Sequence, residues 1–144
     1  MTQISTLRRH AVAVFLISAI LTIAPASSSP AAVREGRHQV PAKICNIDWR
    51  KGRWHVKQLI RCAAAHWHIP GGVETALAIA DRESQFRPHA YNPSGCAGIY
   101  QHMLRYWPGR ASSYGFPGWS AFNARANIIV TMRMVKQAGW GPWS

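Results

Sequence analysis

Acidic residues are scarce in this 144-residue chain, which has five Asp and Glu against 17 Lys and Arg. The last acid along the chain is Glu83, so residues 84–144 contain none. This scarcity restricts the carboxylates available for acid–base chemistry to a short set: Glu35, Asp48, Glu74, Asp81 and Glu83.

The sequence also lacks metal-binding and redox motifs, strand-like patterns and repeats. The three cysteines form no Cys-x-x-Cys pair, which argues against a zinc site or a redox motif. His66 and His68 are two residues apart in a helical stretch and point to different faces, so we expect structural histidines and no metal or other cofactor. No segment alternates between apolar and polar residues, and no internal repeat is present. A mainly α fold is therefore expected.

The longest apolar run, Ala11–Ile23, has 13 residues and is too short for a stable membrane span. Arg8 and Arg9 precede it, and Ala24-Pro25-Ala26 follows as a cleavage site of the A-x-A type. Residues 1–26 are thus predicted to be a signal peptide of a secreted protein, located outside the cell, in the cell wall or in the periplasm. The alternative is an uncleaved N-terminal anchor.

The charge predicts a polyanionic partner. Without residues 1–26 the number of Lys and Arg falls from 17 to 15, which with five acids gives a net charge of +10. For an exported protein the nearest polyanions are the anionic polymers of the cell wall and the membrane surface. Nucleic acid would fit the charge equally well, but export argues against it. We expect a monomer.

Cys45, Cys62 and Cys96 predict one disulfide and one free thiol in an exported chain. A Cys45–Cys62 bond is favoured because it would tie an otherwise loose segment to the first helix. A Cys62–Cys96 bond, which would brace a loop further along the chain, is the rival pairing.

Three regions are expected: the signal peptide, a basic Ser/Pro/Ala-rich lead-in over residues 27–52 that becomes ordered near Cys45, and a helical domain over residues 53–144. Apolar residues at three- and four-residue spacing predict the first helix, and Pro70-Gly71-Gly72 ends it. Further helices are expected over 73–84, over 97–106 and from Asn123 to Gly139, with an irregular stretch over 107–119.

Glu83 is the acid whose position calls for a reason. It lies near the C-terminal end of the second helix, where a negative charge opposes the helix dipole, whereas Glu74 in the first turn is favourable. Ile79 and Phe86 flank it one turn away on its own face, and apolar surroundings favour the protonated form that a general acid needs. The alternative for Glu83 is a salt bridge to Arg82 or Arg87.

Residues 76–90, ALAIADRESQFRPHA, resemble the catalytic helix of SLT-type lytic transglycosylases, which are relatives of goose-type lysozymes. Gly98-Ile99-Tyr100-Gln101 and Asn127-Ile128 resemble two later elements of that family, so the resemblance covers about residues 54–144. It implies a small lysozyme-like helical domain with irregular loops, of the short secreted kind. It also implies that Glu83, in the Glu-Ser pair that closes the helix, is the catalytic acid.

The resemblance implies cleavage of the β-1,4 bond between N-acetylmuramic acid (MurNAc) and N-acetylglucosamine (GlcNAc) in peptidoglycan, with 1,6-anhydro-MurNAc ends. Most glycoside hydrolases need a second carboxylate, and Asp48 is the only remote candidate because Asp81 points to another side of the helix. Ser84, Gln101 and Asn127 would be polar substrate contacts. Tyr100 would stack on a sugar or pack in the core. Four tryptophans have the same two alternatives: Trp107, Trp119, Trp140 and Trp143.

Two other functions remain open. One is a hydrolytic lysozyme-like muramidase on the same fold, in which Asp48 or a bound water replaces the missing carboxylate. The other is a non-catalytic cationic protein that binds the cell wall.

Overall fold

The computed structural model describes residues 44–144, so the predicted signal peptide and the lead-in up to residue 43 lie outside the described residues. The elements in chain order are η1 (Trp49–Lys51), α1 (Arg53–Trp67), α2 (Gly72–Ser84), β1 (Cys96–Ala97), β2 (His102–Met103), α3 (Trp107–Ser113), α4 (Ala124–Ala138) and η2 (Gly141–Trp143). The domain is mainly helical and lysozyme-like, as predicted. No helix within residues 44–144 combines the length and the apolar character needed to span a membrane.

Helices α1 and α2 form where the apolar spacing predicts them. Leu59, Ile60 and Ala63, which recur at helical spacing in α1, are fully buried, and Trp67 at its end is partly buried. His68 adopts a left-handed conformation at the end of α1, and Pro70 follows it. The small residues Ala76 and Ala80 of α2 are fully buried against this core, which lets the two helices pack closely.

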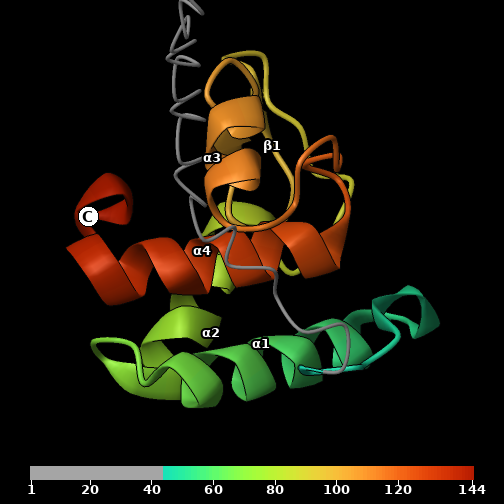
Figure 1. The fold of residues 1–144 in the computed structure, drawn as a ribbon. Coiled ribbons are helices and arrows are strands. Elements are labelled where there is room, and N and C mark those ends of the chain that lie inside the picture. The colour runs from blue at the N-terminus through green and yellow to red at the C-terminus, as the bar shows by residue number, and fades with distance from the viewer. Residues whose placement is uncertain (1–43) are drawn as a thin grey trace, which may run out of the picture. The chain divides into compact units, whose positions relative to one another are not determined.

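Helix α4 lies between α3 on one side and α1 and α2 on the other (Figure 1), and it contributes to two core clusters. Ile128 and Met132 belong to the cluster that includes α1 and α2, and Ile129 and Val130 belong to the cluster that includes α3. Its first turn is capped by Asn123, as predicted, since the side chain accepts a hydrogen bond from the Ala126 N–H at 3.1 Å. Because α4 is buried on two faces, it holds the elements packed on either side of it in fixed positions.

The predicted helix over 97–106 is wrong. The chain there forms an antiparallel hairpin in which Cys96 pairs with Met103 and Ala97 with His102. Gly98 and Gln101, between the two strands, have positive φ angles of 80° and 48°, which no right-handed helix contains. Apolar spacing alone did not reveal these two left-handed positions.

Helix α3 lies in the stretch that was predicted to be irregular. The sequence analysis did not predict this helix because Pro108 and Gly109 are usually helix breakers. Proline is nevertheless well tolerated in a first turn, where its missing N–H costs no hydrogen bond. Burial of Trp107 and Ala111 against α4 stabilises this short helix.

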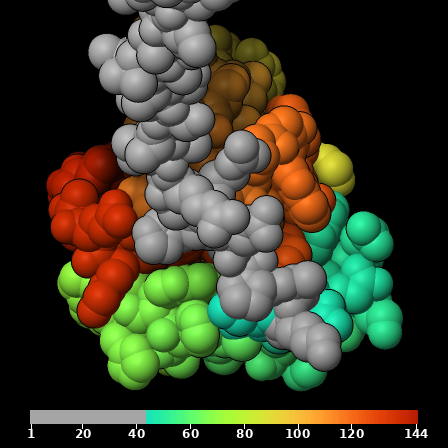
Figure 2. Space-filling view, viewed as in Figure 1, coloured from blue at the N-terminus to red at the C-terminus, as the bar shows by residue number. Residues whose placement is uncertain are grey.

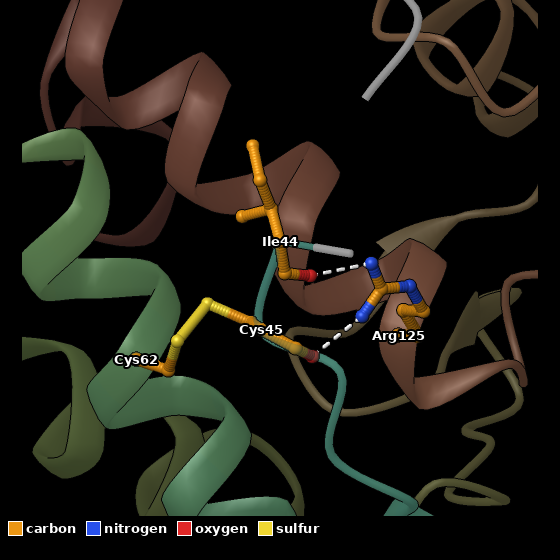
Figure 3. Close-up of a disulfide and its surroundings, with 4 residues drawn as sticks. All are labelled: Ile44, Cys45, Cys62 and Arg125. Carbon is orange, nitrogen blue, oxygen red and sulfur yellow. Dashed lines mark hydrogen bonds between the residues drawn. A yellow bond between two sulfur atoms is a disulfide. The ribbon is translucent and has the colours of Figure 1, made fainter. Parts of the chain in front are cut away.

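The predicted disulfide between Cys45 and Cys62 is confirmed (Figure 3). It joins the segment before η1 to α1. On its other side, Arg125 at the start of α4 donates hydrogen bonds to the carbonyl oxygens of Cys45 at 2.6 Å and Ile44 at 2.5 Å. Cys96 is a free thiol. The residues just before η1 are therefore held to both α1 and α4.

The C-terminal segment packs on the domain through two tryptophans. The indole of Trp143 donates to the Tyr100 carbonyl and that of Trp140 to the Pro70 carbonyl, both at 2.8 Å. In the space-filling view the red C-terminal residues lie against the light green residues of the α1–α2 region (Figure 2). The Trp143 carbonyl also accepts a hydrogen bond from Arg82, next to Glu83.

Candidate active site

A cleft of about 1020 Å³ lies where the end of α2 and the loop after it face η1 and the start of α1. Glu83 lies in the last turn of α2 and lines this cleft. The remaining lining residues come from two segments and one position in the hairpin: Trp49, Arg50, Gly52, Arg53, Val56, Phe86, Arg87, Pro88, His89, Ala90, Tyr91, Asn92 and Gln101.

Glu83 is partly shielded, with 24% of its side chain exposed, and it forms an ion pair with Arg82. Arg82 donates from Nη2 at 2.9 Å and from Nε at 3.2 Å, both to Oε1. No hydrogen bond from the described residues reaches Oε2. The salt bridge expected as an alternative for Glu83 is thus present, and it occupies one carboxylate oxygen.

The backbone turns sharply directly after Glu83. Gln85 and Phe86, which are not glycines, have positive φ angles of 53° and 61°. The Gln85 N–H donates to the Asp81 carbonyl at 2.8 Å and so closes the helix. Phe86 is buried and lines the cleft. Such left-handed residues outside glycine cost free energy and are concentrated at functional sites.

Of the other predicted site residues, the structure brings only Gln101 into the cleft. Its Nε2 donates to the carbonyls of Gly98 at 2.9 Å and Ala90 at 3.2 Å, which fixes the side chain. Ser84 is buried and its hydroxyl donates to the Ala80 carbonyl at 3.2 Å within α2. Ser84 is not among the residues that line the cleft.

Tyr100 and Asn127 lie in the core and do not line the cleft. The Tyr100 hydroxyl donates to the Ala76 carbonyl at 2.9 Å, a position in the core that corresponds to the packing alternative. The Asn127 side-chain amide forms hydrogen bonds with the backbone of the hairpin and with the backbone of the loop before α4. Neither side chain lies where it could contact a sugar bound in the cleft.

The aromatic residues of the cleft differ from those considered in the sequence. Trp107, Trp119, Trp140 and Trp143 are all absent from the lining. Instead, Trp49 and the exposed Tyr91 line it, and the Trp49 ring lies 6.4 Å from that of His89. Sequence analysis missed Trp49 because it was assigned to the basic lead-in, whereas residues 44–51 are held to the domain by the disulfide, by Arg125 and by apolar packing of Trp49 itself.

No second carboxylate lines the cleft among the described residues. Asp48 caps η1 by accepting a hydrogen bond from the Arg50 N–H at 3.2 Å, and Asp81 is exposed. Within residues 44–144 no group of three His, Cys, Asp or Glu side chains is placed to hold a metal ion. Among the described residues, Glu83 is therefore the only carboxyl group available for acid–base chemistry in this cleft.

A family model, the transglycosylase SLT domain, matches residues 58–136, which is more than half of the chain. The chain belongs to the SLT transglycosylase domain family. This family comprises lytic transglycosylases that act on peptidoglycan. Comparisons with curated proteins and with solved structures give no match.

The match to the SLT domain contains all of α2 with Glu83, the hairpin with Gln101 and most of α4 with Asn127. It begins within α1, after Arg50 and Arg53. The SLT match thus covers one wall of the cleft, and the basic residues of the other wall lie before it.

Proposed function

We propose that this SLT domain protein is a secreted peptidoglycan lytic transglycosylase with Glu83 as its single acid and base. It would cleave the MurNAc–GlcNAc β-1,4 bond and leave 1,6-anhydro-MurNAc ends. The observation that carries the proposal is the composition of the cleft, in which Glu83 is the only carboxylate that the described residues supply. The family match supports the reaction class.

The chemistry needs one group that first gives and then takes a proton. Glu83 Oε2, which has no hydrogen-bond partner among the described residues, would protonate the glycosidic oxygen as its bond to the MurNAc C1 breaks. The substrate N-acetyl group would stabilise the positive anomeric carbon. The Glu83 carboxylate would then take the proton of the MurNAc 6-hydroxyl as this oxygen bonds to C1. The proton of Glu83 is restored and no water is consumed.

The neighbours of Glu83 have supporting roles in this scheme. Arg82 holds Oε1, and the Trp143 carbonyl in turn holds Arg82, which orients the carboxyl group. Gln101 would contact the substrate, while Ser84, Tyr100 and Asn127 would position the walls of the cleft. A second carboxylate, which a hydrolase on this fold would take from Asp48, is not among the lining residues.

Secretion fits the Cys45–Cys62 disulfide, since such bonds persist in oxidising compartments. The proposed reaction is tested by digestion of purified peptidoglycan and mass spectrometry of the released muropeptides. Anhydro ends, lighter than reducing ends by one water, are the expected result. Reducing ends would identify a hydrolase, and the absence of products would identify a wall-binding protein.

A further inference from the structure

The wall of the cleft opposite Glu83 is basic. Arg50 is the middle residue of η1 and Arg53 begins α1, and both line the cleft. Arg87, two residues after the α2 cap residue Gln85, lines it as well. Glu83 is the only acid among the described residues that line the cleft, so these three arginines and Glu83 give the described lining a net charge of +2 when histidine is neutral. Binding of a neutral sugar chain alone does not require this positive charge, whereas binding of an anionic group does.

These arginines differ from the structural arginines of the domain. Arg125 donates to two backbone carbonyls and Arg110 donates to His102 at 3.0 Å. Arg53, in contrast, is exposed, and its side chain has no hydrogen bond or ion pair among the described residues. The guanidinium groups in the cleft therefore keep donors available for a ligand.

The other two arginines of the cleft each have one contact that fixes the side chain, and both keep guanidinium N–H donors without a hydrogen-bond partner among the described residues. Arg50 forms a long ion pair with Asp48, in which Nη1 lies 3.9 Å from Oδ1, beyond hydrogen-bond distance, and its Cζ lies 5.7 Å from the centre of the Trp49 ring. Arg87 donates from Nε to the Ser84 carbonyl at 2.9 Å, which leaves both of its Nη groups without a partner among the described residues. A guanidinium that is fixed at one edge loses little entropy when it binds a ligand at the other.

A guanidinium is suited to a planar anion, because it binds a carboxylate through two parallel hydrogen bonds. The muramic acid of a peptidoglycan strand carries carboxylates on its substituent, either in the attached peptide or in the bare lactyl group. We propose that Arg50, Arg53 and Arg87 form a carboxylate subsite in the Glu83 cleft, which binds the muramic substituent beside the bond that is cut. This inference rests on the proposed function for its substrate.

The test measures binding in the Glu83→Gln background, so that its result does not depend on cleavage. Soluble uncrosslinked peptidoglycan strands are compared with the same strands after their carboxyl groups have been capped as neutral amides. Arg50→Gln with Arg53→Gln should raise the Kd for native strands about tenfold and leave the Kd for capped strands unchanged. Equal weakening on both strand types would overturn the proposal.

A matched control separates a subsite from general charge attraction. Arg61→Gln with Arg105→Gln removes the same charge from exposed positions outside the cleft lining. This control should bind native strands within about twofold of the parent. If it weakens binding as much as the cleft variant does, overall charge explains the affinity and the subsite does not exist.

A third substrate identifies the source of the carboxylate. An amidase hydrolyses the amide bond between the lactyl group and the peptide, so treated strands lose the peptide carboxylates and gain a free lactyl carboxylate. If the arginine-dependent affinity persists on them, the subsite accepts the lactyl carboxylate, and if it disappears, the subsite requires the peptide carboxylates. Failure of the transglycosylase proposal would show only as an absence of anhydro products from the wild-type protein, which this binding measurement does not involve.

Discussion

The side-chain oxygen of Asn127 accepts a hydrogen bond of 2.9 Å from the backbone N–H of Tyr100. The Asn127 amide nitrogen donates to the carbonyls of Ala121, at 2.9 Å, and Ala97, at 3.3 Å. One fully buried side chain thus joins α4 to the hairpin that carries Gln101. Because a buried amide without partners is costly, this connection explains why an asparagine lies inside the core.

The first prediction concerns Gly98, which lies against this amide. A Cβ at Gly98 would be 2.2 Å from the Ala121 carbonyl oxygen and 2.3 Å from the Asn127 side-chain nitrogen, and its φ is +80°. Gly98→Ala should therefore lower the free energy of unfolding by at least about 2 kcal/mol, measured by urea denaturation.

Gly109→Ala is the matched control for that substitution. Gly109 lies in α3, and a Cβ added there would have nothing within 4 Å, so alanine should stabilise the protein by about 0.5–1 kcal/mol. Equal effects of the two substitutions would contradict the close approach of Asn127 to Gly98.

The second prediction concerns the disulfide. Cys45 and Cys62 are 17 residues apart, and replacing both with serine should cost about 3 kcal/mol in the chain-entropy model. Cys96→Ser, which removes only the free thiol, should stay close to wild-type stability. Peptide mapping of the non-reduced protein provides an independent check, and a crosslinked peptide containing Cys96 would refute the pairing.

The third prediction concerns His102, which is buried among Trp107, Trp143 and Thr131. Burial, with a smaller contribution from the Arg110 charge, lowers the pKa of His102 to about 3. Arginine only donates, so Nδ1 accepts from Arg110 and Nε2 donates to Thr131 at 2.7 Å. The folded protein thus keeps His102 neutral.

The unfolded chain takes up this proton below about pH 6.5 while the folded protein does not, so stability falls as the pH falls from 6.5 towards 3. Between pH 7 and pH 5, wild type should lose about 2 kcal/mol more than His102→Gln. His66→Gln, the same change at an exposed histidine, is the matched control for the substitution itself. Identical curves for wild type and His102→Gln would disprove the neutral buried histidine.

The sequence predicted the long helices well because their apolar residues recur at helical spacing, as Leu59, Ile60 and Ala63 do in α1. It failed over residues 97–106 because the hairpin is set by left-handed positions at Gly98 and Gln101, which tertiary contacts with Asn127 support. Trp49, Arg50 and Arg53 were missed as cleft residues for a related reason. Long-range contacts bring them to Glu83, and no local pattern marks such contacts.

The central claim is that Glu83 alone supplies the acid and base of the reaction. The most direct measurement is the release of anhydro muropeptides from purified peptidoglycan by wild type, Glu83→Gln and Asp81→Asn, with folding checked by circular dichroism. Gln is nearly isosteric but has no acidic proton, so Glu83→Gln should bind the wall and release no product, while Asp81→Asn remains active. Activity of Glu83→Gln above about one twentieth of wild type would contradict the claim.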